Sequence, residues 1–521
     1  MIRRHPVALA MGCLLLTAAL GLLLRPPVPI DETRYLAVAW EMHSTGNWLV
    51  PSKNFALYSD KPPLLFWAIN LVWLATGVSG FAARLVGPAF ACLAIWLVAR
   101  LAHRLWPGDR DATGRAAMAL AGLAVFALSG SLTMFDVPLT VAVLAGLIAL
   151  DAARPGGWQT WAGFGAAIAL GVLTKGPVIL FHLLPAALLL PLWSGTGIRW
   201  RELPAGLGFA IAVALGLVAL WLVPAAVLGG PAWREAVLWH QSAGRLAGSF
   251  AHARAWWWYL ALLPVLGFPL LWSPGLWREG WRTPWRQDRG LRLCLIWTGA
   301  ALVLFSLTSG KQLHYLVPEL PALALIAARL GRNVPGFALQ PAIIAVGLAG
   351  LAAVAAGFGA LPLRLRTLFD PASTFLAWAL LAAALCWMAM RWRGGAGAMT
   401  LSLGLLLATN LLIGTTRTAR VYDAGPIAAR LAAHRADGLA FAGAPYHAEF
   451  NFAARLTEPV AELLDPAALR SWAARHPQGL IAGRTDLATP SWPPRETILF
   501  RNRDYGIWSV ADAPPAERNP G

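Results

Sequence analysis

The sequence predicts an all-α membrane protein that crosses the bilayer many times and ends in a small α/β unit. Of its 521 residues, 58% are hydrophobic and 13% are charged, and the mean hydropathy is +0.58. This composition is too apolar for a soluble globular protein. Apolar runs of about 17–25 residues, each long enough to cross roughly 30 Å of hydrocarbon, recur along most of the chain.

We predict thirteen membrane spans from these runs. The first follows a short basic segment and resembles a signal peptide, but it lacks a small-residue cleavage site and further spans follow, so we expect it to remain as the first helix. The predicted spans are 7–24, 84–106, 115–133, 137–152, 159–174, 177–193, 204–228, 257–273, 291–308, 312–330, 338–358, 374–391 and 398–416.

The arginines predict how these spans are oriented. When Arg3 and Arg4 are placed in the cytoplasm, the alternate short loops carry most of the arginine, as the positive-inside bias requires. In a bacterium, the chain would then lie in the inner membrane with the opposite loops facing the periplasm. We attribute the net charge of +17 to the arginine-rich loops rather than to nucleic-acid binding. The loop arginines are Arg100, Arg104, Arg110, Arg115, Arg154, Arg199, Arg201, Arg278, Arg282, Arg286, Arg289, Arg329, Arg332, Arg391 and Arg393.

Two large polar segments then face the periplasm. In the loop 25–83, residues 31–45 and 64–78 look helical but are too short or too charged to span, so we expect them to lie along the membrane surface. The tail from residue 417 alternates helical and β-like runs. Its expected helices lie near 424–435 and 466–475, and its expected strands near 438–442, 478–482, 496–501 and 506–510.

We accordingly expect two parts. Residues 1–416 would form a transmembrane part that includes the loop 25–83, and residues 417–521 would form a periplasmic α/β domain. The tail carries no metal or nucleotide motif, so a supporting role is expected for it.

Short polar islands with charges of both signs gather on the predicted periplasmic face. Lysine and arginine bind phosphate through charge-assisted hydrogen bonds, so the face suits a phosphorylated, membrane-borne substrate. An aspartate beside apolar residues at a membrane boundary is costly and indicates function, although Asp136 could instead cap the helix that follows it. The islands are Asp31–Tyr35, Asp60–Pro63, Met134–Pro138, Leu173–Pro177, Leu238–Arg254 and Ser309–Tyr315.

A metal site is a further alternative on this face. His240 and His252 could ligate a divalent metal together with Asp60 or Asp136. No spacing in the chain matches a known metal motif. The sequence therefore establishes no cofactor, and Asp60 and His240 are kept as candidate ligands of a divalent metal.

Taken in order, the islands resemble the GT-C glycosyltransferases that use polyprenyl-phosphate sugars. Within this family the likeness is to the lipid A 4-amino-4-deoxy-L-arabinose transferases, which are related to dolichyl-phosphate-mannose protein mannosyltransferases. The likeness covers residues 1 to about 330 and depends on motifs of good specificity. The matching pieces are DETRY at 31–35, DKPPLLFW at 60–67, FDVP at 135–138, LTKGP at 173–177, WHQSAGR with SFAHAR within 239–254, and KQLHYLVPELPALAL at 311–325.

The resemblance implies roles for individual residues. It implies that Asp31 is the acidic residue of the first periplasmic loop, with Asp136 as a second catalytic candidate, and that Lys61, Arg245 and Tyr315 hold the phosphate of the carrier lipid. Arg34, Lys175 and Lys311 would line the same cavity together with Asp136. We further include His240 and Arg254 as substrate-binding candidates.

The resemblance also implies a reaction. The donor would be a sugar on undecaprenyl phosphate, and the acceptor would be lipid A or a similar periplasmic molecule, with inversion at the anomeric carbon. Two alternatives remain: a protein O-glycosyltransferase using the same class of donor, and a transporter or flippase for a lipid-linked sugar. A transporter would place its ionisable residues in mid-span, whereas most of those here lie at span ends, which favours an enzyme.

Overall fold

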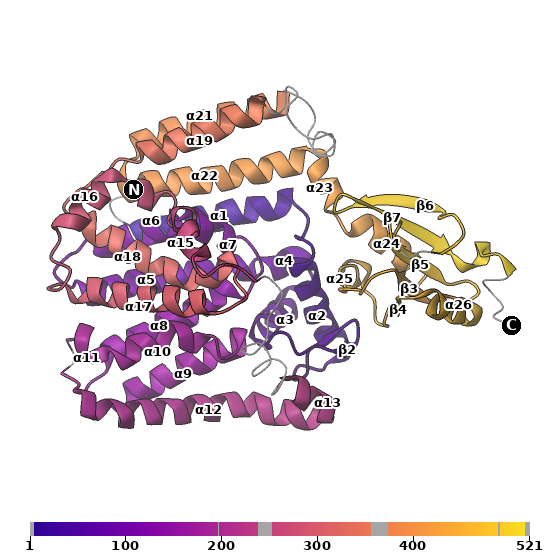
Figure 1. The fold of residues 1–521 in the computed structure, drawn as a ribbon, viewed down its shortest axis with the longest axis horizontal. Helices are drawn as coiled ribbons and strands as arrows, with labels where there is room; N and C mark the ends of the chain where they lie inside the picture. Colours follow the sequence, from indigo (N-terminus) through magenta and orange to yellow (C-terminus); the bar gives the residue numbers. More distant parts are fainter. Residues whose placement is uncertain (1–4, 196, 238–252, 356–372, 488–489, 516–521) are drawn as a thin grey trace.

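The computed structural model describes residues 5–195, 197–237, 253–355, 373–487 and 490–515. Its larger part is a bundle of helices, and its smaller part is a five-stranded sheet with short helices at one end of the bundle (Figure 1). The N-terminus lies at the opposite end of the bundle from the sheet. This arrangement confirms a mainly helical fold with a small C-terminal α/β region.

Every predicted span coincides with helical structure. Nine are single helices or end in one long helix, and the other four are divided into shorter segments. In chain order they are α1 (Pro6–Leu24), α4 (Gly80–Arg84) with α5 (Val86–Leu105), α6 (Ala112–Ala121) with α7 (Ala124–Gly130), α8 (Asp136–Ala152), α9 (Trp158–Lys175), α10 (Ile179–Leu188) with α11 (Leu190–Trp193), α12 (Leu203–Leu228), α15 (Trp258–Leu266) with η3 (Leu270–Trp272), α17 (Arg289–Leu307), η4 (Leu313–Glu319) with α18 (Leu320–Leu330), α19 (Gln340–Ala355), α21 (Ser373–Arg391) and α22 (Gly394–Thr415).

The chain is a multi-pass membrane protein. In the part of the chain that the structure describes, six helical segments are long and apolar enough to cross a bilayer, or seven if α6 and α7 together form one bent span. The remaining helices are shorter or less apolar, so the number of thirteen stays a prediction.

The bend between α6 and α7 has a local cause. The two helices meet at 73°, and the carbonyl of Gly122 between them accepts a hydrogen bond of 2.7 Å from Ser402 of α22. A Cβ atom at position 122 would lie 2.8 Å from the backbone nitrogen of Met399, so only glycine permits this close approach of α22.

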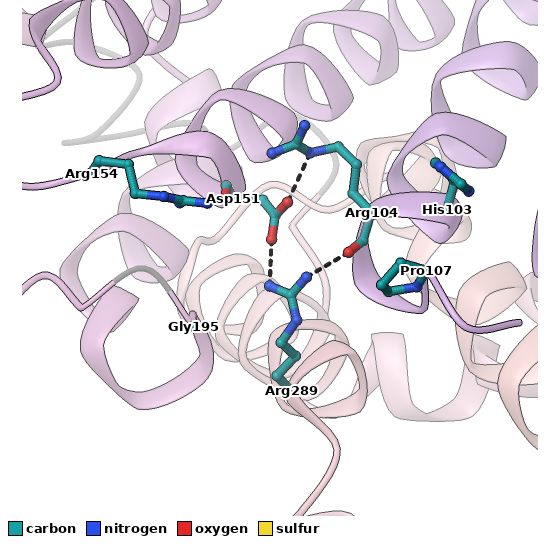
Figure 2. Close-up of a pocket in the computed structure, with 7 residues that line it drawn as sticks. All are labelled: His103, Arg104, Pro107, Asp151, Arg154, Gly195 and Arg289. Carbon is teal, nitrogen blue, oxygen red and sulfur yellow. Dashed lines mark hydrogen bonds and ion pairs between the residues drawn. The ribbon is translucent and has the colours of Figure 1, made fainter.

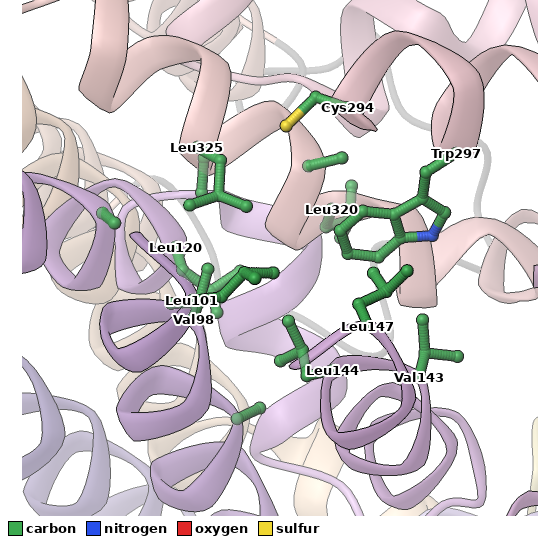
Figure 3. Close-up of a cluster of buried hydrophobic side chains, with 14 of the residues drawn as sticks. Val98, Leu101, Leu120, Val143, Leu144, Leu147, Cys294, Trp297, Leu320 and Leu325 are labelled. Carbon is green, nitrogen blue, oxygen red and sulfur yellow. The ribbon is translucent and has the colours of Figure 1, made fainter. Parts of the chain in front are cut away.

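The middle of the bundle is a continuous apolar core. Side chains from α5, α6, α8, α17 and α18 interdigitate there, and those drawn in Figure 3 are almost fully buried. This packing holds the ends of α5, α8 and α17 in fixed relative positions. The labelled residues are Val98, Leu101, Leu120, Val143, Leu144, Leu147, Cys294, Trp297, Leu320 and Leu325.

The predicted helices of the loop 25–83 are present. α2 (Asp31–Thr45) ends at Gly46, whose φ of 72° is the left-handed conformation that glycine favours at a helix end. α3 (Leu64–Thr76) begins directly after Pro62 and Pro63. Between them, a small hairpin that the sequence analysis missed pairs β1 (Ser52–Lys53) with β2 (Ala56–Leu57).

The C-terminal sheet has the strand order β4-β3-β5-β7-β6. β3 is parallel to β4 and β5, whereas β7 is antiparallel to β5 and β6. All four expected strands and both expected helices occur, and β4 and α25 were missed because each is only three or four residues long. The elements are α23 (Arg417–Val421), α24 (Gly425–Ala433), β3 (Leu439–Ala442), α25 (Asn451–Ala454), β4 (Ala461–Leu463), α26 (Pro466–Arg475), β5 (Leu480–Arg484), β6 (Glu496–Phe500) and β7 (Arg503–Ser509).

The C-terminal region packs directly on the loop 25–83. Asn54 exchanges two hydrogen bonds of 2.8 Å with the backbone of Val460. The buried carboxylate of Glu41 accepts hydrogen bonds from the hairpin and one of 3.2 Å from Asn451. One apolar cluster runs through both segments, so the tail and the loop form one packed unit.

Candidate functional site

The predicted site residues come from five chain segments that meet where the bundle borders this unit. Asp31 and Arg34 lie on the first turn of α2, Asp136 starts α8, Lys175 ends α9, and Tyr315 lies in η4. Lys175, His314 and Lys61 all interact electrostatically with the Asp136 carboxylate, and Asp31 interacts with His314. The fold therefore gathers residues that are up to 284 positions apart into one charged cluster.

Asp136 and Lys175 form the innermost pair of this cluster. Asp136 is 2% exposed, and the Lys175 Nζ lies 2.5 Å from its Oδ1 and 4.8 Å from the centre of the Tyr315 ring. Asp136 is the first residue inside α8 and not its cap, so the alternative of a capping role is not realised, although its charge favours the helix N-terminus.

The backbone explains why Lys175 projects at this point. α9 ends at Lys175 because Gly176 follows with a φ of 80° and Pro177 cannot continue the helix. The ammonium group therefore projects from the last residue of a packed helix, so the backbone of Lys175 has little conformational freedom.

Asp31 is the accessible carboxylate of the cluster. Its side chain is 48% exposed and is held by Arg34 at 2.5 Å, and the Tyr35 hydroxyl donates a longer bond of 3.4 Å to the same oxygen. Tyr35 packs edge-on against Phe135 at 4.9 Å, and Lys61 Nζ lies 6.0 Å from the centre of the Phe135 ring. These two aromatic rings therefore join Asp31 to Lys61 and to the turn that carries Asp136.

Glu32, the neighbour of Asp31, has a different environment that the sequence analysis missed. It is 1% exposed and accepts hydrogen bonds from Arg25 at 2.7 Å, Val28 N at 2.9 Å and Thr133 N at 2.9 Å, with Arg84 3.8 Å away. Burial alone would raise its pKa, but the two arginines and two backbone N–H groups hold the pKa of Glu32 below its ordinary value. Glu32 ties α2 to the start of α8 and so positions Asp31.

Lys311 and Arg254 are linked to each other through the backbone, not through side-chain ion pairs. Lys311 is 3% exposed, and its ammonium group donates to the backbone carbonyls of Thr308 and Arg254. These bonds reinforce the bridge between Ala253 and Gly310. Arg254 itself is exposed. Their predicted contacts with substrate stay predictions.

Three predicted residues, His240, Arg245 and His252, lie outside the described residues. Asp60 is half-buried beside Lys61. Within the described part of the chain, no three His, Cys, Asp or Glu side chains lie close enough together to hold a metal ion. Since His240 lies outside the described residues, metal binding by Asp60 and His240 remains a hypothesis.

A buried ionisable pair lies within the bundle. His182 Nδ1 lies 2.5 Å from Glu319 Oε1, and the side chains are 1% and 3% exposed. The ring of His182 is 5.2 Å from that of Phe305, which in turn is 6.0 Å from Tyr315. The sequence feature that could have indicated this pair is His182 itself, because an ionisable residue within the apolar run 177–193 is unusual.

Comparisons with known proteins agree with this arrangement. Residues 60–223 match the family model described as dolichyl-phosphate-mannose-protein mannosyltransferase. A relative from Pseudomonas paraeruginosa, an undecaprenyl phosphate-alpha-4-amino-4-deoxy-L-arabinose arabinosyl transferase, is 33% identical over 307 residues, which is 57% of this chain and 54% of the relative. A second from Pseudomonas aeruginosa, of the same description, is 32% identical over 347 residues, or 62% and 61% of the two chains.

The family resemblance is confirmed. The chain is similar to the arabinosyl transferases and to the mannosyltransferase family, although it matches only 54–61% of the length of these two relatives. Crystal structures of ArnT from Cupriavidus metallidurans share the fold at 19% identity. The apo form has a TM-score of 0.75 and the form bound to undecaprenyl phosphate 0.72, over 98% of this chain and 98–99% of theirs.

The contrast between Glu32 and Asp31 gives a test of the site's construction. We expect Glu32→Gln to lower the free energy of unfolding by about 3–5 kcal/mol, because it leaves Arg25 buried without its counter-ion. Asp31→Asn, which breaks a half-exposed pair, should cost less than about 1 kcal/mol. Thermal unfolding of the purified protein, followed by tryptophan fluorescence, compares the two variants.

The loss of stability caused by Glu32→Gln should depend on pH. A carboxylate with a lowered pKa contributes stability at neutral pH that is lost as the pH falls through its pKa in the folded state. The difference between the wild type and Glu32→Gln should therefore shrink in acid. Equal stability of Glu32→Gln and Asp31→Asn at neutral pH would contradict the anchoring role of Glu32.

Proposed function

We propose that this protein transfers a sugar, with 4-amino-4-deoxy-L-arabinose as the first candidate, from undecaprenyl phosphate to lipid A or a similar periplasmic acceptor. The observation that carries the proposal is the convergence of Lys61, Lys175 and Tyr315 on Asp31 and Asp136 at one end of a membrane-embedded bundle. The similarity to arabinosyl transferases of that description supports the donor and the acceptor.

In this proposal the cations stabilise the leaving group. The bond between the anomeric carbon and the phosphate oxygen breaks, and the carrier phosphate departs with the bonding electrons. Lys61, Lys175 and Arg245 would balance this negative charge, with Tyr315 as a hydrogen-bond donor, which lowers the barrier because the charge develops in the transition state. Lys175 is bound to Asp136 before the donor arrives, so Asp136 holds the ammonium group in position.

Asp31 would act on the acceptor side. A hydroxyl acceptor must lose a proton as it attacks, and the half-exposed Asp31 carboxylate is accessible to accept it. A lipid A phosphate is already ionised and needs no base, in which case Asp31 would orient the sugar or stabilise positive charge at the anomeric carbon. Attack on the face opposite the phosphate inverts the configuration in either case. Arg34, His240, Arg254 and Lys311 complete the proposed binding set.

A protein O-glycosyltransferase is the second candidate. The specific observation in its favour is the match of residues 60–223 to the mannosyltransferase family model. The longer identity with arabinosyl transferases, over more than 300 residues, favours lipid A. A lipid-linked sugar transporter is disfavoured because the charged cluster lies at helix ends.

The proposal includes an orientation and a division of the chain. We propose thirteen spans in a bacterial inner membrane, a catalytic part over 1–416 and a periplasmic domain over 417–521. The arginine-rich loops and the position of the N-terminus opposite the sheet support this topology.

A reporter fused after Gly521 tests the orientation. We expect alkaline phosphatase, which is active only in the periplasm, to be active at this position, and a cytoplasm-specific reporter to be silent. An odd number of spans with Arg3 and Arg4 in the cytoplasm requires this result. A signal from the cytoplasmic reporter would overturn the topology.

Replacing Lys61 tests the leaving-group step. Lys61→Ala should reduce transfer by about 10²-fold or more, because it removes a charge that stabilises the departing phosphate, and Lys61→Arg should retain part of the activity. Lys53→Ala in the same loop is the matched control, since Lys53 faces His447 of the tail. Mass spectrometry of lipid A from a deletion strain carrying each variant gives the readout, and full modification with Lys61→Ala would exclude this role.

Asp31→Asn distinguishes between the two kinds of acceptor. We expect a near-complete loss of transfer with carrier-lipid binding retained. Loss of a general base should cost about 10²–10⁴-fold with a hydroxyl acceptor, and a smaller factor with a phosphate acceptor. Turnover is measured with purified donor and each class of acceptor. Wild-type turnover with both would remove Asp31 from the reacting centre and leave Asp136 as the next candidate.

A further inference from the structure

A second charged site lies at the other membrane face. Asp151 is near the C-terminal end of α8, fifteen residues after Asp136, so along a helix the two are roughly 22 Å apart. Around Asp151 is a cavity of about 440 Å³, lined by His103, Arg104, Arg154 and Arg289 among others (Figure 2). The proposed transfer reaction uses none of these residues.

The carboxylate of Asp151 organises two of the arginines. Its side chain is 2% exposed, and its two oxygens accept one bond each, from Arg104 Nε at 2.8 Å and from Arg289 Nη1 at 2.7 Å. Arg289 also donates through Nη2 to the backbone carbonyl of Arg104. Figure 2 shows the two guanidinium groups on either side of the carboxylate. Their directions are therefore fixed before any ligand binds.

The cavity retains an excess of positive charge and of donors. Three arginines face one carboxylate, and their combined charge exceeds the partial negative charge of the helix C-termini nearby. Within the described residues, both Nη atoms of Arg104 make no hydrogen bond, and Arg154 uses only Nη1, toward backbone carbonyls. A planar fork of guanidinium donors matches the oxygens of a phosphate group.

The surroundings indicate that the phosphate belongs to a lipid. A second cavity, of about 320 Å³, shares Arg154 with the first and is lined by Trp158, Trp161 and Ile198. Trp158 is 51% exposed, as is typical of tryptophan at the membrane interface. The lining of the second cavity also includes Arg201 and Glu202. A phosphate site that shares Arg154 with a cavity lined by tryptophans, at a bilayer boundary, suits a head group with an attached glycerol and acyl chain.

We propose that this cavity binds the phosphate of an anionic phospholipid. In the proposed orientation the lipid lies in the cytoplasmic leaflet, opposite the carrier-lipid site. Its phosphate is held by Arg104, Arg154 and Arg289, while the head group extends toward His103 and the glycerol toward Trp158. The bound lipid bridges the ends of α5, α8 and α17.

Native mass spectrometry of the full-length protein tests the site, with phosphatidylglycerol and phosphatidylcholine added in equal amounts. We expect the wild type to retain phosphatidylglycerol preferentially. Arg154→Gln should weaken retention by about tenfold, the size expected for one hydrogen bond to a charged group, and Arg154→Lys should weaken it less. Arg154→Gln leaves the Arg104–Asp151–Arg289 pairing intact, so it tests binding without removing the structural ion pairs.

Arg100→Gln is the matched control, because Arg100 lies on the same helix as Arg104 but stacks on Trp96, 5.0 Å from the ring centre, outside the cavity. Its retention should equal that of the wild type. Equal retention by Arg154→Gln, or equal retention of phosphatidylcholine, would overturn the site. Displacement of the lipid by an equal concentration of inorganic phosphate would overturn its assignment to a lipid. None of these readouts depends on sugar transfer.

Discussion

The buried carboxylate of Glu32 is the interaction on which the site's geometry depends. It accepts hydrogen bonds from Arg25 at the end of α1 and from the backbone of Thr133 before α8, with Arg84 of α4 close by. A charge that is 1% exposed at a membrane boundary is tolerated only when it is paired and fully hydrogen-bonded. These partners come from three separate segments, so satisfying Glu32 fixes α2 against the bundle. Asp31, Arg34 and Tyr35 take their positions from that attachment.

Adjacent acidic residues thus have opposite roles because of their surroundings. Glu32 points into the structure and is saturated by donors, whereas Asp31 points outward and keeps an accessible carboxylate. Asp136 is intermediate, since it is buried but bound to the ammonium group of Lys175. The starts of α2 and α8 therefore carry one fixed carboxylate, one carboxylate paired with a lysine and one exposed carboxylate. A phosphate that enters this cluster would meet cations whose partners are already arranged around it.

Much of this architecture could be predicted from the chain. The apolar runs predicted a helix for every span, and the alternation in the tail predicted four of its five strands, because both signals depend on local periodicity. The broken helices could not be predicted, since the bend at Gly122 is set by Ser402 and Met399 from 280 residues away. For the same reason, the sequence predicted that Asp136 and Lys175 share a membrane face but not that they form a pair. His182 and Glu319 are 137 positions apart in the sequence, and the backbone contacts of the Lys311 ammonium group also come from the tertiary fold.

The packing of the tail on the loop 25–83 has a consequence for biogenesis. Asn54 is made early by the ribosome, but its partner Val460 is made 406 residues later. Leu456, whose carbonyl accepts a hydrogen bond from Trp40, is made 416 residues after Trp40. Until the tail has been synthesised, α2 and the hairpin lack the surface that holds them, and the buried Glu41 lacks Asn451. The emerging chain therefore contains its charged residues long before it can hold them in register. Assembly of the charged cluster is therefore coupled to completion of the polypeptide.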